Sequence, residues 1–467
     1  MTPPKVIIVG LDSVPPALAF QYYKDVMPNF SALCDEGSFG PLRSTDPPIT
    51  IPAWVSMTTG KNPGQLGMYG FQRHIGPGKA RLICTDDIQF PRIWDLAAAS
   101  KQRSVVVSVP LTYPAKPSPL ITMTTGFLTP STETRWATRP SLARQLHEQF
   151  GEYIIDVSDF RSTDIKRIYR DCVQFTQQHF AIFRHLIRST APQFAMMVDL
   201  GPDRLHHAAL RYILPTHPKF EPSDIGRRYY QLLDNEIGRT LELAGGDTLV
   251  MVVSDHGVRP LEGCVCINEL LINQGYLVLD EPYPTTPTPI EKLRIDWSRT
   301  VATAKGGYVG RVFIHTNTNS SLHAQNTQRR NLLHSIRRCI ETLPSPTESP
   351  LHHKIFHVDE LYPEATGTPP DLTIYFDNLR LRAAGTIGHR ALFIPTNDNG
   401  PDDANHDYHG ILAANQPLDN STEYLIYDVF QTALHALGLP MPTQTNGRAL
   451  QLTEENGKHC SVQTRPR

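Results

Sequence analysis

The chain has 467 residues, of which 40% are hydrophobic and 19% charged, a composition that can bury a core and excludes an intrinsically disordered protein. Its 44 Lys and Arg nearly balance its 46 Asp and Glu, and the formal charge of -2 gives no electrostatic reason to expect a nucleic-acid-binding protein or a polybasic membrane contact. The length suits one large domain with insertions or several ordinary domains.

The N-terminal segment and the cysteines bear on the cellular compartment. Residues 6–11 are apolar, but they are too short for the hydrophobic part of a signal peptide and lead into Asp12 without a cleavage site of small residues. No run of about 18 apolar residues predicts a membrane-spanning helix. The seven cysteines are odd in number and scattered, which favours reduced thiols, and Cys264 and Cys266 have the wrong spacing for a CxxC motif. We therefore expect a cytoplasmic protein that does not contact membranes.

Apolar strand-like segments alternate with helical patterns along the first half of the chain, which is typical of parallel strands joined by crossover helices. The expected strands are residues 6–9, 103–109, 194–198 and 248–253, and the last two are continuously apolar, as in strands covered on both faces. The expected helices are residues 93–100, 204–214 and 224–244. The pattern predicts an α/β fold with a doubly wound, mostly parallel sheet flanked by helices.

The composition and the pattern of the sequence change between residues 258 and 388. Proline-rich loops occur at residues 281–289 and 344–350, a helix is expected over residues 329–342, and a strand over residues 371–376. We interpret residues 258–388 as a cap subdomain inserted into a catalytic core of residues 1–257 and 389–452. In the second part of the core, residues 391–394 and 410–412 are expected to return to the main sheet, residues 424–437 form a closing helix, and residues 453–467 are a polar tail.

Three aspartates follow apolar strands at the place where a doubly wound sheet carries its functional groups, beyond the carboxyl ends of the strands. Asp12 follows residues 6–11, Asp203 comes shortly after residues 194–198, and Asp255 follows residues 249–253 through Ser254. Any one of them alone is more often a helix cap or a turn former than a ligand. Their occurrence together with histidines favours a metal site.

The histidines have spacings that suit metal binding. Asp203 and His207 stand at i and i+4, so a helix places both on one face, while His206 points about 100° away and is expected to be structural. Asp255 and His256 are adjacent at a strand end, where a turn can aim both at one ion, and His406 supplies another imidazole from a loop. A mixed set of Asp and His ligands suits zinc, with manganese or iron as alternatives.

Thr50 is a candidate nucleophile. It stands between prolines in a loop that leads into a helix, so its hydroxyl is expected near a helix N-terminus, which is a favourable place for phosphate. Metal coordination would lower the pKa of the hydroxyl and activate it without a histidine base. The alternative is that Thr50 only caps the helix.

An ordered series of short motifs covers nearly the whole chain: residues 9–12, 50–54, 59–60 with 63–64, 109–114, 126–131, 203–204, 254–257, 267–270, 371–376, His406 four before Gly410, and residues 438–440. Through these motifs the chain resembles the type I phosphodiesterase/nucleotide pyrophosphatase family of the alkaline phosphatase superfamily, most closely its branch of predicted phosphohydrolases and phosphomutases. The resemblance implies an alkaline phosphatase-like core with two divalent metal ions.

The resemblance also implies the roles of the candidate residues. Asp203, His207 and His406 would hold one metal ion, and Asp12, Asp255 and His256 the other, which also binds the Thr50 oxygen. The implied mechanism is in-line attack by Thr50 on phosphorus, a covalent phosphothreonine and its hydrolysis by water.

The expected substrate contacts depart from the family pattern. Nucleotide pyrophosphatases of this family hold a phosphate oxygen with an Asn shortly after the nucleophile, whereas this chain has Phe71-Gln72-Arg73-His74. We expect Gln72 or Arg73 to substitute for the Asn. Lys305 and His389 of the cap region are further candidates for substrate contact, with a structural role as the alternative.

We therefore expect a two-metal phosphodiesterase that acts on a small-molecule phosphate ester and not on nucleic acid. The alternatives are a phosphomonoesterase or phosphomutase of the same superfamily, or a non-catalytic binding protein on this scaffold. A mutase would favour a Ser nucleophile, and a binding protein would have lost ligands. A sulfatase is disfavoured because no Cys or Ser stands in a C/S-x-P-x-R frame near the start.

Overall fold

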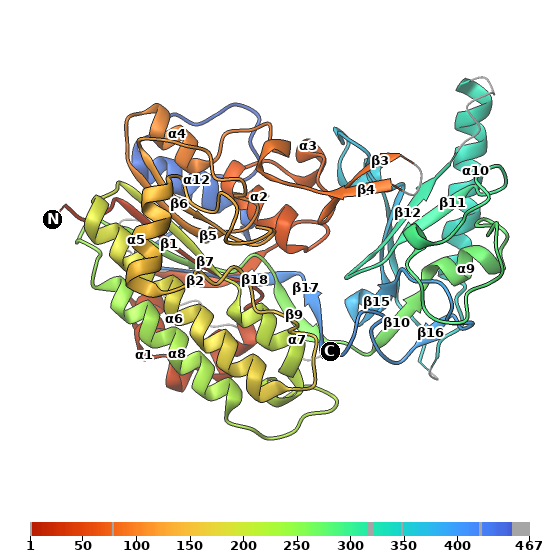
Figure 1. Cartoon of the computed structure of the whole chain (residues 1–467), viewed down its shortest axis with the longest axis horizontal. Helices are drawn as coiled ribbons and strands as arrows, with labels where there is room; N and C mark the ends of the chain where they lie inside the picture. Colours follow the sequence, from red (N-terminus) through yellow and green to blue (C-terminus); the bar gives the residue numbers. More distant parts are fainter. Residues whose placement is uncertain (1, 77–78, 316–321, 347–348, 420–422, 451–467) are drawn as a thin grey trace.

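The computed structural model describes residues 2–76, 79–315, 322–346, 349–419 and 423–450. They form a large α/β lobe and a smaller second lobe beside it (Figure 1). The expected polar tail of residues 453–467 lies outside the described residues.

An eight-stranded sheet runs through the large lobe. In spatial order its strands are β19 (Tyr424–Leu425), β2 (Ser38–Arg43), β18 (His409–Ala414), β8 (Leu249–Val253), β1 (Val6–Leu11), β7 (Phe194–Asp199), β5 (Ser104–Val109) and β6 (Ile121–Thr125). All neighbours are parallel except at β18, which is antiparallel to both β2 and β8. Every residue of β1, β5, β6, β7 and β8 is buried, so the interpretation of the apolar runs as strands covered on both faces is confirmed.

Helices cover both faces of this sheet, and the expectation of a doubly wound sheet is confirmed. One face carries α1 (Pro28–Glu36), α5 (Pro140–Phe150), α6 (Ile165–Thr190), α7 (Gly201–Ile213) and α8 (Ile225–Leu241), which share an apolar core with Ile7 and Val9 of β1. The opposite face carries α2 (Thr50–Thr59), α4 (Ile93–Ala99) and α12 (Ile426–Leu437), which pack on Val6 and Ile8.

Gly10 of β1 occupies a position that has no room for a side chain. A Cβ atom on Gly10 would lie 2.5 Å from the Trp54 ring and 2.8 Å from Val198. The absence of a side chain lets α2 approach the strand, and this close approach places Trp54 beside Asp12.

The second lobe contains two small sheets. One consists of β10 (Gly263–Cys266), β15 (Leu381–Ala384) and β16 (Phe393–Ile394), and the other of β11 (Ala302–Lys305), β12 (Gly310–Ile314), β14 (Leu372–Tyr375) and β13 (Lys354–His357). Helices α9 (Ile267–Asn273) and α10 (Leu322–Glu341) accompany them, and an apolar core of their own lies between these elements. The remaining short elements are α3 (Pro63–Leu66), α11 (Val358–Leu361), η1 (Leu18–Tyr22), η2 (Lys24–Val26), η3 (Thr85–Asp87), η4 (Ile290–Lys292) and η5 (Phe376–Leu379).

One expectation about the second half of the core is wrong. Residues 391–394 were expected in the main sheet, but β16 pairs antiparallel with β10 in the second lobe. The physical reason is local packing, because Phe393 and Ile394 lie against Val265 and Cys264. The chain returns to the main sheet only at β18, which includes the expected residues 410–412.

Two ribbons reach from the large lobe toward the second lobe (Figure 1). The first pairs β9 (Gly257–Pro260) with β17 (Ala404–Asp407), so the chain enters and leaves the second lobe side by side. The second is the hairpin of β3 (Gln72–Gly76) and β4 (Lys79–Leu82), from which His74 contacts the Phe313 ring of β12. Residue 258, the expected start of the cap subdomain, lies in β9, whereas residue 388, its expected end, lies before β16 and therefore still within the second lobe.

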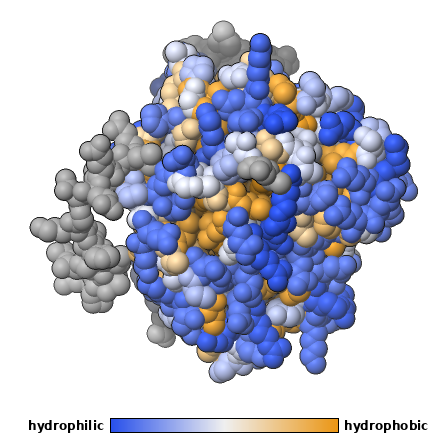
Figure 2. Space-filling view, turned by 90° about the vertical axis from the view of Figure 1, so that its left-hand side faces the viewer, coloured by the Kyte–Doolittle hydropathy of each residue, from blue (hydrophilic) through white to orange (hydrophobic). Residues whose placement is uncertain are grey.

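The end of the large lobe that faces away from the second lobe is mostly hydrophilic, with hydrophobic side chains visible near its centre (Figure 2). Within the described ranges, no helix combines the length and the apolarity that crossing a membrane requires. The six cysteines of the described residues all carry free thiols, including the closely spaced Cys264 and Cys266.

Candidate metal centre and nucleophile

The six predicted ligands and Thr50 come together at the carboxyl ends of the central strands. Asp12 follows β1, Asp255 and His256 follow β8, Asp203 and His207 lie on α7 directly after β7, His406 lies on β17, and Thr50 begins α2. All seven side chains are buried, with at most 4% of their surface exposed. Elements that are distant in the sequence therefore bring these seven side chains into one compact cluster.

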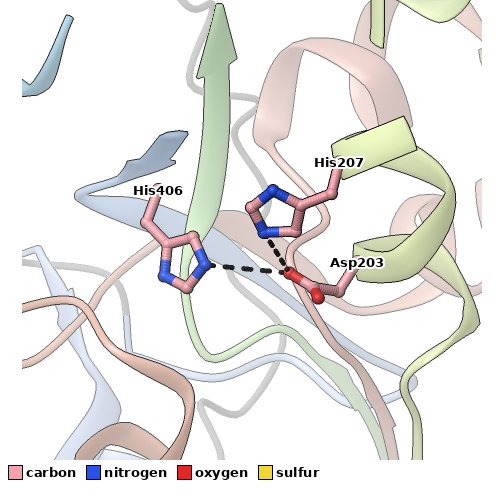
Figure 3. A group of neighbouring side chains, drawn as sticks. All are labelled: Asp203, His207 and His406. Carbon is pink, nitrogen blue, oxygen red and sulfur yellow. Dashed lines mark ion pairs between the residues drawn. The ribbon is translucent and has the colours of Figure 1, made fainter. Parts of the chain in front are cut away.

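The first group of possible ligands is Asp203, His207 and His406 (Figure 3). Asp203 Oδ1 lies 3.3 Å from His207 Nε2 and 3.8 Å from His406 Nε2. The i, i+4 spacing on α7 turns Asp203 and His207 toward each other, and the β17 strand brings His406 to them from the opposite side.

The second group of possible ligands is Asp12, Asp203 and His256. His256 Nε2 lies 3.5 Å from Asp12 Oδ1 and 3.4 Å from Asp255 Oδ2, so Asp255 adjoins this group. Asp203 thus belongs to both groups and lies between them, whereas the family resemblance implied that it serves one ion only.

The three imidazoles are held so that their Nε2 atoms face the cluster. Their Nδ1 atoms lie against oxygens that only accept hydrogen bonds: His207 against Asp402 Oδ1 at 2.7 Å, His256 against the Gly257 carbonyl at 3.0 Å, and His406 against the Pro48 carbonyl at 2.8 Å. Each Nδ1 therefore carries a proton, and Nε2 of His256 and of His406, whose pKa values burial lowers, offers a lone pair, as a metal-binding histidine requires. Burial also acts to lower the pKa of His207, but Asp402 and Asp203 raise it to about 10, so a metal ion there would replace the proton on Nε2.

Several buried polar atoms of the cluster have no hydrogen-bond partner among the described residues. They are Asp12 Oδ1, Asp203 Oδ1, Asp255 Oδ2 and His406 Nε2. Burial and the charge of Asp203 raise the pKa of Asp12 well above its usual value, and burial with Asp12 does the same to Asp255. Burial also acts to raise the pKa of Asp203, but His207 and Arg204 hold it well below its usual range. Unpartnered acceptors on buried carboxylates fit a divalent cation, which would satisfy them and neutralise their repulsion.

Thr50 is the first residue of α2, and Ile49 occupies the capping position. Thr50 therefore does not occupy the capping position. Thr50 Oγ1 lies 3.4 Å from His256 Nε2, at the edge of the second group of ligands. The start of α2 adds backbone N–H groups and the positive end of the helix dipole, both of which favour an anion.

Contacts around the cluster involve residues to which no role could be assigned from the sequence. Trp54 Nε1 donates a hydrogen bond to Asp12 Oδ2 at 2.7 Å, and Arg204 Nη1 donates to Asp203 Oδ2 at 2.6 Å. These two hydrogen bonds leave the second oxygen of each carboxylate free to face the centre of the cluster. Trp54 and Arg204 were visible only as members of family motifs, and Asp402, the partner of His207, had no signal in the sequence.

Tyr308 of the second lobe reaches the cluster. Its ring stacks on His406 with a centroid distance of 3.4 Å, and its hydroxyl lies 3.5 Å from His207 Nε2. Tyr308 and Thr50 line the same cavity of about 490 Å³, which has walls from both lobes.

The predicted substrate contacts divide into two pairs. Gln72 and Lys305 line this cavity. Arg73 and His389 are not among its lining residues: Arg73 forms an ion pair with Asp87, and His389 Nε2 lies 2.7 Å from Thr386 Oγ1.

His206 turns away from the cluster, as its helical position predicted. It is fully buried, with Nδ1 3.1 Å from the Ser13 carbonyl and Nε2 3.2 Å from the Tyr230 hydroxyl. Both ring nitrogens have structural partners.

Comparisons with known proteins agree with this fold. The sequence model of the family "type I phosphodiesterase / nucleotide pyrophosphatase" matches residues 6–408. The structure of phosphonoacetate hydrolase from Sinorhizobium meliloti 1021, in complex with phosphonoformate, is similar with a TM-score of 0.60 at 16% identity, covering 93% of this chain and 96% of that chain. Human ectonucleotide pyrophosphatase / phosphodiesterase 5 is similar with a TM-score of 0.53 at 13% identity, covering 95% and 96%. No curated protein matches the chain in sequence.

Proposed function

The chain belongs to the type I phosphodiesterase/nucleotide pyrophosphatase family of metal-dependent phosphoester hydrolases, and from this premise we propose that it is a phosphodiesterase with Thr50 as its nucleophile. The substrate would be a small-molecule phosphate ester. Cytoplasmic location is part of the same proposal and is supported by the free thiols of the described cysteines.

The observation that carries the proposal is the position of the Thr50 hydroxyl. It lies at the N-terminus of α2, beside the cavity and 3.4 Å from His256 Nε2. A hydroxyl so placed adjoins both a helix end that favours anions and the cluster of six buried candidate ligands.

The ligand set suits two divalent ions, with Asp203, His207 and His406 holding one and Asp12, Asp255 and His256 the other. Zinc accepts such mixed nitrogen and oxygen ligands, and manganese and iron are the alternatives. When bound, such ions supply positive charge that lowers the pKa of a neighbouring hydroxyl and stabilises the charge of the transition state.

The chain's own residues would perform the displacement in two steps. Thr50 Oγ1 gives up its proton and forms a bond to phosphorus as the bond to one ester oxygen breaks. That oxygen takes up a proton and leaves as the alcohol, and the phosphothreonine keeps the second ester group. Water then breaks the bond between Thr50 Oγ1 and phosphorus and regenerates the hydroxyl. Gln72 and Lys305, on the cavity wall, are the substrate contacts that we propose.

Hydrolysis of bis-p-nitrophenyl phosphate and p-nitrophenyl phosphate by metal-replete protein tests the proposal. We expect turnover of the diester, abolition by a chelator, and a loss of at least about 1,000-fold in Thr50→Ala. Thr50→Ser should retain activity because it keeps the hydroxyl. Thr59→Ala is the matched control, since its hydroxyl donates to the Val55 carbonyl within the same helix.

The other outcomes are also informative. Turnover of the monoester alone would replace the phosphodiesterase by a phosphatase or mutase. Full activity of Thr50→Ala would overturn the nucleophile. Absence of turnover with stoichiometric metal bound would favour a binding protein on this scaffold.

A further inference from the structure

The cavity beside Thr50 is strongly cationic. Its lining includes five Arg or Lys side chains and two acidic ones: Arg161, Arg204, Lys305, Arg311 and Arg382 against Glu291 and Asp398. Its volume of about 490 Å³ is in the range of small-molecule sites and exceeds what a phosphoryl group alone would fill. The cavity therefore has room and charge for a further part of the substrate.

Three of the five cations form ion pairs with acidic residues that lie outside the cavity lining. Arg204 forms an ion pair with Asp156, and Arg161 and Arg382 share the buried carboxylate of Asp402. Ion pairs within the protein therefore account for the positions of these three arginines. Lys305 and Arg311, both from the second lobe, are different.

Arg311 is a fixed cation without an acidic partner among the described residues. Its Nη1 donates to the Tyr69 carbonyl at 3.0 Å, its Nη2 donates to the Gly306 carbonyl at 2.7 Å, and its Nε has no partner. Burial lowers the pKa of Arg311 to about 10. A Cβ atom on Gly70 would lie 2.1 Å from Nη1, so the glycine leaves the space that the guanidinium occupies.

Lys305 lies directly opposite Arg311 in the antiparallel pair of β11 and β12. Like charges in this position destabilise a sheet. Burial and Arg311 together lower the pKa of Lys305 to about 8, and its acidic contact, Glu291, is 41% exposed on the cavity wall. Two cations face each other across the strands, and a half-exposed carboxylate contacts one of them, Lys305, an arrangement that an anionic ligand would stabilise.

We propose that the substrate carries, beyond its phosphoryl group, a second anionic group of the carboxylate or phosphate class, and that Arg311 and Lys305 bind it. This inference rests on the proposed function, because it places the reacting phosphoryl group at Thr50. The glycine at position 70 and the two carbonyl contacts hold the guanidinium in place before the substrate arrives, which limits the entropy lost on binding.

Matched esters test the proposal. As monoesters we would compare ethyl phosphate with 2-phosphoglycolate and with the bisphosphate of ethane-1,2-diol, and as diesters ethyl 4-nitrophenyl phosphate with carboxymethyl 4-nitrophenyl phosphate. We expect kcat/KM to favour an ester with the second anion by about 10- to 100-fold. A stronger preference for 2-phosphoglycolate than for the bisphosphate would identify the second anion as a carboxylate, and the reverse order would identify it as a phosphate. In Arg311→Met and Lys305→Met the preference should fall about tenfold, whereas Lys354→Met, on β13 of the same sheet, should keep it.

A binding measurement separates this inference from the proposed reaction. Calorimetry on metal-loaded Thr50→Ala should show tighter binding of 2-phosphoglycolate than of ethyl phosphate, and this difference should disappear on adding Arg311→Met or Lys305→Met. Preferential binding without hydrolysis by the wild type would support the anion site and overturn the phosphodiesterase. Hydrolysis without a preference, or a preference that survives in both variants, would overturn the anion site alone.

Discussion

A single buried carboxylate, Asp402, connects the candidate metal centre to the cavity wall. It accepts hydrogen bonds from His207 Nδ1 at 2.7 Å, from Arg161 Nε at 2.9 Å and from Arg382 Nη1 at 2.5 Å. Burial would raise the pKa of Asp402, but His207 and the two arginines hold it well below its usual range. The carboxylate is therefore ionised, and it fixes both the tautomer and the orientation of His207.

Asp402→Asn is expected to weaken metal binding by about 10- to 100-fold, because a neutral amide holds the imidazole less firmly than a carboxylate does. Competition with a chromophoric chelator measures the affinity. Asp403→Asn is the control, since Asp403 forms its ion pair with Arg211 and not with His207. Wild-type affinity in a folded Asp402→Asn protein would show that Asp402 does not position the ligand.

At the residue scale, the residues of the cluster were easier to predict from the sequence than the residues that hold them in place. Asp12 and Asp255 follow apolar strands, and Asp203 and His207 have helical spacing, so local pattern and family motifs were sufficient. Asp402 stands in a polar segment after Pro401, and its contact with His207 arises only when β17 folds beside α7. No local pattern encodes such a tertiary contact.

At the scale of elements, the longest helix, α6, was not predicted. Its buried residues include Ile168, Phe175 and Phe183, a helical period, but many Arg, Gln and His residues stand between them. Continuous apolar strands were easier to recognise, because burial on both faces leaves no polar residue to mask the pattern. Strand β16 was placed in the wrong sheet because two apolar residues do not specify a partner strand.

The buried His179 of α6 should make the stability of the protein depend on pH. Burial lowers the pKa of His179 to about 3, and its Nε2 lies 2.8 Å from the Ile154 carbonyl. Between about pH 6.5 and 3 the unfolded chain binds a proton there that the folded protein does not, so folding stability falls as the pH falls through about 6.5. The loss between pH 7.5 and pH 5 amounts to about 2 kcal/mol for this group.

His179→Gln keeps a donor for the Ile154 carbonyl and removes the titration. Urea unfolding at pH 7.5 and pH 5, with a chelator present throughout, should show a difference in stability about 2 kcal/mol smaller than in the wild type. His147→Gln, an exposed histidine on α5, should behave like the wild type. Equal pH dependence in all three proteins would mean that His179 does not contribute.

At the scale of the whole molecule, the site is formed where the lobes meet. The large lobe supplies the carboxylates and Thr50, the β9–β17 ribbon supplies His406, and the second lobe supplies Tyr308, Lys305 and Arg311. The doubly wound core could be predicted because it follows from the order of elements along the chain, and the same order led us to expect an inserted segment. The sequence could not predict which face of the insertion turns toward Thr50, since that depends on packing between distant surfaces.

Removing metal should lower the stability of the assembled molecule. Three buried carboxylates, Asp12, Asp203 and Asp255, lie close together, and ions that bind only the folded protein stabilise it by about 3–4 kcal/mol at 100 to 1,000 times their dissociation constant. For a chain of this size we expect the unfolding temperature to fall by about 2–4 °C on chelation. Differential scanning calorimetry with and without saturating zinc or manganese measures the change.

In the absence of metal, Asp12→Asn should not lower the unfolding temperature of the protein. The amide oxygen still accepts from Trp54 Nε1, and one of the three mutually repelling charges is gone, so in chelator this variant should unfold at the same temperature as the wild type or higher. With saturating metal it should gain less than the wild type, because one ligand is weakened. If metal raises both unfolding temperatures equally, the ions bind elsewhere, and if the variant is the less stable protein in chelator, repulsion among the carboxylates is not what the metal relieves.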